Sequence, residues 1–282
     1  MDRTQAEAES RLAEVSNEAQ RNAASYRLPA LDQDFLLSDS MRGVRFLLEY
    51  AKAEMTLRQW SVQSTIVVFG SARVRADSPG REGWWYDQAR RFAYIASRKG
   101  GALCDNGGVR ENVIATGGGP GIMEAANRGA AEAGAPSIGF NITLPHEQEP
   151  NAYSTPDLTF RFHYFAMRKM HLAMRAKALV VFPGGFGTLD ELFEILTLRQ
   201  TDKAPVIPIV LFDRDYWTSI INFDALIEYG MISREDLNLF CFADDAESAW
   251  AELVSRGLAT ASIVDADQGR AGVVNANMEQ TA

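Results

Sequence analysis

The chain has 282 residues, and 46% of them are hydrophobic, so it has ample material for a buried core. A formal net charge of -9 argues against binding to nucleic acid, which generally needs a basic face, although a small anion needs only a local site. Cys104 and Cys241 belong to no Cys/His cluster, which argues against a disulfide framework or a metal site. Without a leader or a run of roughly 18 apolar residues, we expect a cytoplasmic protein that does not enter the membrane.

We expect an N-terminal helical extension over 1–60, a main domain over 61–262 and a flexible tail over 263–282. The first 25 residues or so are polar and rich in Ala and Glu, which predicts a frayed helix or disorder. A Ser-Asp-Ser start signal precedes an amphipathic pattern over 41–57, which predicts a packing helix. Its apolar positions are Met41, Val44, Leu47, Leu48, Ala51 and Met55.

Short apolar runs, most of them rich in β-branched residues, alternate with helical patterns through the main domain. They lie at 65–69, 113–116, 137–140, 178–182, 206–211 and 239–242. Strands that are apolar on both faces and alternate with helices indicate a mostly parallel sheet covered on both sides. We therefore predict a doubly wound, Rossmann-like α/β fold.

Three strand-to-helix turns stand out, because ligands of open α/β sheets bind beyond the carboxyl ends of the strands. Gly70-Ser71-Ala72-Arg73 follows the first strand and offers a hydroxyl and a cation to an anion. Thr116-Gly117-Gly118-Gly119-Pro120-Gly121 follows the second strand, and Pro183-Gly184-Gly185-Phe186-Gly187-Thr188 follows the fourth.

Glycines at such turns allow free N–H groups at the helix start to point at a phosphate. A single glycine-rich turn is about as often a tight turn without a ligand as it is a phosphate-binding site. Two of them in one sheet favour a nucleotide. Neither turn has the spacing of a Walker loop, which argues against ATP hydrolysis. Neither has the GxGxxG spacing of the dinucleotide fingerprint, which argues against NAD binding.

Charged residues lie near the third turn. Thr188 and Glu191 have the spacing of a capping box, in which Glu191 would reach back to a backbone N–H. Alternatively, Glu191 is a carboxylate beside a phosphate loop, where it could stabilise positive charge or orient a water. Glu194 shares its helix face, and a like charge so near would raise one pKa of the pair. Upstream, Arg168 and Lys169 form a basic pair, which in isolation is more commonly a solvated surface.

The stretch from Pro183 to Glu191 resembles the PGGxGTxxE signature of the LONELY GUY (LOG) family, once widely labelled lysine decarboxylase-like. Arg168-Lys169 resembles the family's Arg-Lys pair, and 117–123 resembles its GGGxxGxM turn, so the resemblance covers roughly residues 64–245. Plant members have Met-His where this chain has Phe165-Ala166 before Met167, which leaves base recognition open. Phe186 stands where Tyr is common, and the long N-terminal extension likewise points to a bacterial branch.

The resemblance implies a phosphoribohydrolase, an N-glycosidase that cuts a purine nucleoside 5′-monophosphate (AMP or a cytokinin ribotide) into free base and ribose 5-phosphate. It implies that Arg168 and Glu191 are the catalytic pair and that no cofactor is needed. The expected substrate-binding residues are Gly70, Ser71, Gly118, Gly119, Gly121, Lys169, Gly184, Gly185, Gly187, Thr188 and Glu194.

The family is dimeric, so the resemblance also implies a homodimer or higher homo-oligomer. The alternative is a non-catalytic nucleotide-binding or sensing protein on the same scaffold. The older decarboxylase label has no support, because neither Lys169 nor Lys177 has the context of a pyridoxal phosphate site.

Overall fold

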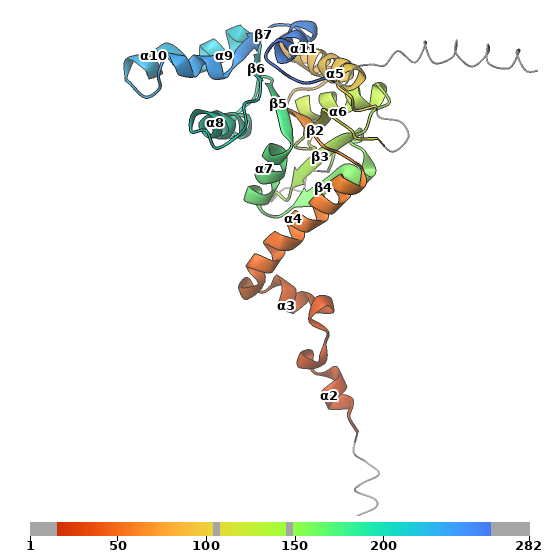
Figure 1. The fold of residues 1–282 in the computed structure, drawn as a ribbon. Helices are drawn as coiled ribbons and strands as arrows, with labels where there is room; N and C mark the ends of the chain where they lie inside the picture. The colour runs from red at the N-terminus through yellow and green to blue at the C-terminus, as the bar shows by residue number, and fades with distance from the viewer. Residues whose placement is uncertain (1–15, 104–107, 145–148, 261–282) are drawn as a thin grey trace, which may run out of the picture. The chain divides into compact units, whose positions relative to one another are not determined.

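The computed structural model describes residues 16–103, 108–144 and 149–260, and Figure 1 labels most of its helices and strands. The expectations for the first 15 residues, for Cys104 and for the tail over 263–282 lie outside these ranges. The chain divides into two compact units, Met1–Glu49 and Tyr50–Ala282. The three-part division expected from the sequence stays a prediction. No described helix is long and apolar enough to cross a membrane.

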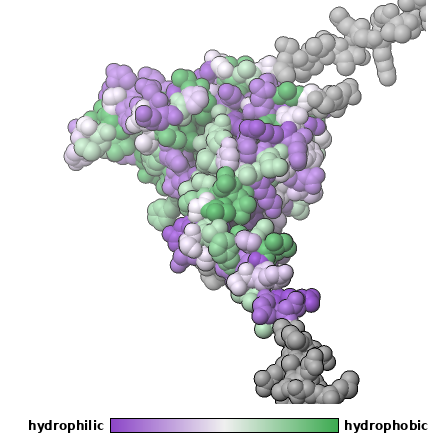
Figure 2. All heavy atoms as spheres, turned by 60° about the horizontal axis from the view of Figure 1, so that its bottom comes forward, coloured by the Kyte–Doolittle hydropathy of each residue, from purple (hydrophilic) through white to green (hydrophobic). Residues whose placement is uncertain are grey.

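The first unit contains short helices and none of its described residues is buried. Its elements are α2 (Glu18–Asn22), α3 (Gln33–Leu37), 3-10 turns at Ala24–Tyr26, Pro29–Leu31 and Asp39–Met41, and the start of α4 (Arg42–Gln59). Apolar side chains, green in Figure 2, lie on the surface of the molecule.

The prediction for the packing face of α4 is wrong. Val44, Leu47, Leu48 and Met55 of the expected apolar row are exposed. The buried side of α4 instead carries Ala53, Glu54 and Leu57, because only the last turns of this helix pack on the core of the second unit.

The second unit is built on a seven-stranded parallel sheet with the order β4-β3-β2-β1-β5-β6-β7, which confirms the doubly wound prediction (Figure 1). The strands are β1 (Thr65–Phe69), β2 (Val113–Thr116), β3 (Ser137–Ile142), β4 (Thr159–Phe162), β5 (Ala176–Val181), β6 (Ile209–Phe212) and β7 (Cys241–Ala243). The helices are α5 (Arg81–Lys99), α6 (Ile122–Glu132), α7 (Phe165–Met174), α8 (Phe186–Gln200), α9 (Arg214–Ile220), α10 (Phe223–Glu228) and α11 (Ala246–Ser255). A last 3-10 turn spans Glu235–Leu239.

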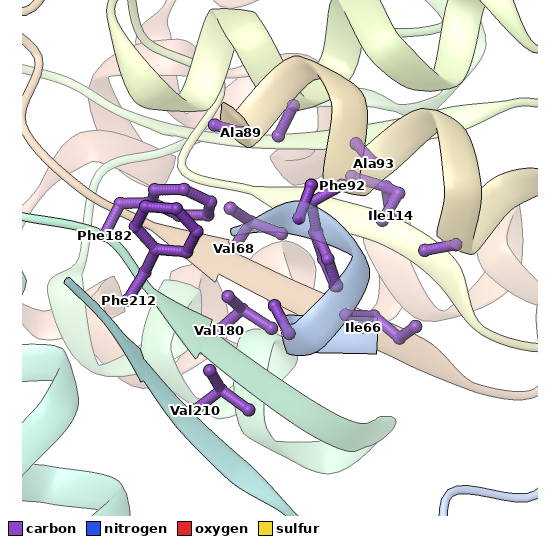
Figure 3. Close-up of a cluster of buried hydrophobic side chains, with 14 of the residues drawn as sticks. Ile66, Val68, Ala89, Phe92, Ala93, Ile114, Val180, Phe182, Val210 and Phe212 are labelled. Carbon is purple, nitrogen blue, oxygen red and sulfur yellow. The ribbon is translucent and has the colours of Figure 1, made fainter. Parts of the chain in front are cut away.

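Side chains alternate between two cores along each central strand, because successive residues of a strand point to opposite faces. Ile66 and Val68 of β1 enter the core beneath α5, α6 and α11, whereas Val67 enters the core on the other face. Figure 3 shows the first of these cores, in which the rings of Phe182 and Phe212 stack with centroids 4.3 Å apart. Burial on both faces holds the strands in register.

Two strands differ from the sequence expectation. The patterns do not predict β4, whose residues alternate between buried and less buried because it is an edge strand. The run expected over 206–211 pairs as a strand only from Ile209. Val206 is 82% exposed, and Pro208 has no N–H to give to a ladder.

Strand order places the ligand crevice. β1 and β5 are neighbours, with Val67 opposite Leu179 and Phe69 opposite Val181. From β1 the chain continues to β2 on one side, and from β5 it continues to β6 on the other side. The loops after β1 and β5 therefore diverge, which leaves a crevice at their carboxyl ends.

Candidate active site

A cleft of about 840 Å³ lies at this divergence. Its volume is within the range of small-molecule sites. Of the residues expected from the sequence, Gly70, Ser71, Arg168, Gly184, Gly185, Gly187, Thr188 and Glu191 line it. The turns after β1 and β5 touch each other, because Ser71 N–H donates to the Pro183 carbonyl over 2.9 Å. Two turns far apart in sequence thus share one cleft.

The start of α8 offers backbone donors to this cleft. Gly185 is the N-cap residue, and its carbonyl accepts from the N–H groups of Thr188 and Leu189, each over 3.0 Å. The N–H groups of Gly185, Phe186 and Gly187 have no acceptor among the described residues. Unpaired N–H groups at a helix N-terminus attract anions.

The capping-box prediction is wrong. α8 begins at Phe186, two residues before Thr188, and its N-cap Gly185 has no side chain to cap with. Thr188 instead occupies the space beside Gly184, where any Cβ on that glycine would collide with the threonine hydroxyl. Glu191 is therefore in the second turn of α8, too far along to reach back to the N-cap.

Glu191 is paired with Arg168 across the cleft wall. Nη2 of Arg168 donates to Oε1 of Glu191 over 2.6 Å, and the two side chains are only 13% and 5% exposed. Arg168 comes from the first turn of α7, and its guanidinium carbon also lies 5.1 Å from the ring centroid of Phe165. The solvated-surface interpretation of the Arg-Lys pair is thus wrong.

Burial raises the pKa of the Glu191 carboxyl above its ordinary value. Arg168 and Lys169 oppose this rise by stabilising the carboxylate, and the like charge of Glu194 adds to it as the smallest contribution. Desolvation, rather than the neighbouring carboxylate expected from the sequence, dominates the shift. A group tuned in this way inside a cleft is a candidate for chemistry.

Lys169 and Glu194 do not line the cleft. Nζ of Lys169 binds Asp190 over 2.7 Å and Glu194 over 2.8 Å, so it joins α7 to α8 just behind Glu191. Their predicted contact with substrate stays a prediction. Where they are, they hold the helix that carries Glu191 against the helix that carries Arg168.

The second glycine-rich turn contributes Gly117 to the cleft lining, whereas Gly118, Gly119 and Gly121 are not among the lining residues. Gly118 N–H is taken by the Thr116 hydroxyl over 2.9 Å, and a Cβ on Gly118 would collide with the Asn141 amide. Gly121 has φ +74°, and a Cβ there would strike the Ser71 carbonyl. These glycines therefore permit close backbone packing, and their predicted role in binding stays a prediction.

Several lining residues were not among the expected site residues. Trp85 of α5 and Tyr216 of α9 line the cleft, and the Tyr216 hydroxyl donates to the Gly184 carbonyl over 2.8 Å. Met123 and Phe186 also line it, and the Phe186 side chain is 92% exposed. β6 ends beside β5, so the rule that points to strand ends could have found the turn that leads to Tyr216.

The chain is similar in sequence to one protein family and to several plant proteins. Residues 123–253 match the family model described as "Possible lysine decarboxylase". LOG4 of Oryza sativa subsp. japonica, a probable cytokinin riboside 5′-monophosphate phosphoribohydrolase, is 28% identical over 139 residues, which cover 48% of this chain and 59% of the relative. LOG3 of Arabidopsis thaliana, a cytokinin riboside 5′-monophosphate phosphoribohydrolase, is 30% identical over 129 residues, which cover 43% and 57%. The chain thus spans less than two thirds of the length of either relative.

Among solved structures, the Moco carrier protein of Chlamydomonas reinhardtii aligns with 69% of this chain and 97% of its own length, at 21% identity and a TM-score of 0.45. This alignment says nothing about what the chain binds. The family model, the curated relatives and the signature that ends at Glu191 all make the chain similar to the LOG family.

Proposed function

We propose that the protein hydrolyses the N-glycosidic bond of a purine nucleoside 5′-monophosphate, AMP or a cytokinin ribotide, to the free base and ribose 5-phosphate. Its relatives carry the name of this activity. One observation carries the proposal: a buried carboxylate, Glu191, is held by Arg168 in the same cleft that is lined by Gly185, Phe186 and Gly187, whose N–H groups lack acceptors among the described residues.

The phosphate binds at the N-terminus of α8, where the N–H groups of Gly185, Phe186 and Gly187 lack acceptors among the described residues. This anchor brings the ribose towards Glu191. The bond between C1′ and the base nitrogen then breaks, and its electron pair leaves with the base. A water oxygen attacks C1′, its proton is lost, and a proton is added to the departing base.

Glu191 acts on the charge that develops during bond cleavage. The ribose C1′ gains oxocarbenium character, and a carboxylate nearby lowers the barrier by preorganised electrostatics. The same carboxylate is placed to orient the attacking water. Burial strengthens either effect, because the low local dielectric leaves the charge poorly screened.

Arg168 is permanently protonated and is therefore a poor general acid. Its contact with Glu191 favours a role in orienting that carboxylate and holding it ionised. The rest of its guanidinium donors remain to bind phosphate or polarise the departing base. Nε of Arg168 is buried and has no hydrogen-bond partner among the described residues.

The test is release of adenine from AMP by the purified protein. We expect Glu191→Gln and Arg168→Ala each to lower kcat/KM by at least about 100-fold with the fold intact, since each removes a group that acts in the transition state. The matched control is Glu132→Gln, which removes a surface carboxylate of α6 that binds Arg90 and Arg128. Unchanged AMP turnover in both cleft variants would overturn the proposal, and tight AMP binding without adenine release would favour the sensing protein.

A further inference from the structure

The loop between β5 and α8 contains a peptide unit whose two flanking residues have no side chains. The Gly184–Gly185 peptide is flanked by two glycines, and a Cβ on Gly185 would meet no atom within 4 Å. Glycine backbones rotate with little steric cost, so this peptide can reverse the directions of its C=O and N–H groups. A reversed peptide would present an oxygen, rather than an N–H, on the side where a phosphate is proposed to bind.

The Tyr216 hydroxyl holds the oxygen of this peptide. It donates to the Gly184 carbonyl over 2.8 Å. In a trans peptide the C=O and N–H point in opposite directions, so fixing the carbonyl also fixes the Gly185 N–H. That N–H has no acceptor among the described residues, and Gly185 lines the cleft.

We propose that Tyr216 is a positioning residue, which locks the Gly184–Gly185 peptide so that the Gly185 N–H is available to the phosphate of the substrate. This inference rests on the proposed function, because it assigns a task within the same anion site. Tyr216 acts through the loop and need not touch the reacting atoms.

A buried aspartate holds Tyr216 in place. Asp213 directly follows β6 as the N-cap residue of α9 and is 1% exposed. Its φ of +73° is a left-handed conformation that aspartate tolerates better than most residues. Its Oδ1 accepts from the Tyr216 N–H over 3.1 Å and from Arg81 over 2.6 Å. Its Oδ2 accepts from the Trp85 indole N–H over 2.7 Å.

The same aspartate therefore fixes both the backbone of Tyr216 and the neighbouring indole. The Trp85 ring packs edge-on against the Tyr216 ring, with centroids 5.6 Å apart. The ring pair restricts the tyrosine side chain, and the hydrogen bond to Asp213 restricts its backbone. Residues from α5 and from the start of α9 thus hold the Tyr216 side chain whose hydroxyl binds the Gly184 carbonyl.

The hydroxyl stays a donor across the neutral pH range. Burial raises the pKa of Tyr216 above its ordinary value, against a smaller opposing effect of the bond to Gly184. A protonated hydroxyl donates to a carbonyl, whereas a phenolate would repel it. The lock is therefore independent of pH where Glu191 titrates.

The test compares two tyrosine-to-phenylalanine variants. Tyr216→Phe removes only the hydroxyl that binds Gly184. Tyr86→Phe is the matched control, because Tyr86 is 3% exposed, its hydroxyl donates to Glu124 over 2.8 Å, and it does not line the cleft. Each variant is titrated with inorganic phosphate by calorimetry, assayed for AMP turnover and melted to check the fold.

We expect Tyr216→Phe to raise the Kd for phosphate and the KM for AMP on the order of 5- to 10-fold, the effect of one lost hydrogen bond. We expect kcat to change less than about two-fold, since the phosphate lies away from the broken bond and binds ground and transition states alike. Tyr86→Phe should alter neither constant. A purely structural role for Tyr216 would lower the melting temperature without this split.

The inference is overturned if Tyr216→Phe binds phosphate as tightly as the wild type, or if Tyr86→Phe weakens binding equally. If the wild type cleaves AMP and the two variants show the same Kd and KM, the positioning role of Tyr216 is wrong and the proposed function stands. If the wild type cleaves no AMP but binds phosphate, and only Tyr216→Phe weakens that binding, the proposed function is wrong and the positioning role of Tyr216 stands. A wild type that binds no phosphate overturns the lock.

Discussion

At the scale of single residues, the same side chain can be a cap or a catalyst, and its neighbours decide which. The Thr188–Glu191 spacing satisfies the capping-box pattern, yet α8 begins at Phe186 and Glu191 binds Arg168 instead. Arg168 lies 23 positions away in sequence. The motif points to the residue, and the environment that tunes it arises only when α7 and α8 meet.

The raised pKa of Glu191 predicts an acidic limb in the activity profile. The proposed role needs the carboxylate, so kcat/KM should fall as the pH drops through the raised pKa, at a higher pH than the value of about 4.3 for an ordinary glutamate. The measurement is adenine release from AMP against pH, with Glu191→Gln as the variant whose residual rate should lack this limb.

The raised pKa of Glu191 also makes the stability of the protein depend on pH. A carboxyl whose folded pKa is raised binds more protons in the folded than in the unfolded state between the two pKa values. Its contribution to the free energy of unfolding therefore decreases as the pH rises through that interval. For the activity profile, an acidic limb centred at or below the ordinary pKa of glutamate would contradict the proposed role of the Glu191 carboxylate.

At the scale of elements, glycines decide how closely helices approach. Gly129 of α6 faces α5 so closely that a Cβ would collide with the Arg90 carbonyl. The collision is with backbone, which cannot move aside as a flexible side chain can. The packing of α5 on α6 thus depends on one missing side chain.

Gly129→Ala should therefore destabilise the protein by about 2 kcal/mol or more, as overpacking of a core does. Urea unfolding measures the loss. The control is Gly43→Ala in α4, where no atom lies within 4 Å of the new Cβ. There the better helix propensity of alanine should stabilise by up to about 1 kcal/mol. Equal effects of the two substitutions would contradict the packing argument.

Elements also show how far the sequence patterns reach. Five of the six apolar runs overlap the observed strands within two residues at each end, because strands buried on both faces are continuously apolar. The sixth, at 206–211, fails where Pro208 interrupts the ladder. β4 is not predicted at all, since its residues Thr159–Phe162 alternate between buried and less buried and include Arg161, so they form no continuous apolar run.

At the scale of the whole molecule, we propose a homodimer, which the family resemblance implies. Leu47 and Leu48 on α4 are 63% and 53% exposed, and Phe193 on α8 is 41% exposed. Apolar surface of this kind is favourable to cover in an assembly.

Light scattering should give a mass of about twice the 31.1 kDa of one chain. Leu47→Glu should shift the protein towards the monomer, because it places a charge in the proposed interface. Val206→Glu is the control, since Val206 is 82% exposed but lies on neither helix. A monomeric wild type, or equal effects of the two substitutions, would contradict the proposal.

The sequence by itself determined the doubly wound sheet, the turns at the ends of β1 and β5, and the LOG signature around Glu191. These features are local: periodicity, glycines and motif spacing are readable over a few residues. Tertiary structure decided which of the glycines line the cleft, that Arg168 holds Glu191, and that Tyr216 holds Gly184. Those contacts arise because the sheet sets β5 between β1 and β6, and strand order is a property of the packed chain rather than of any segment.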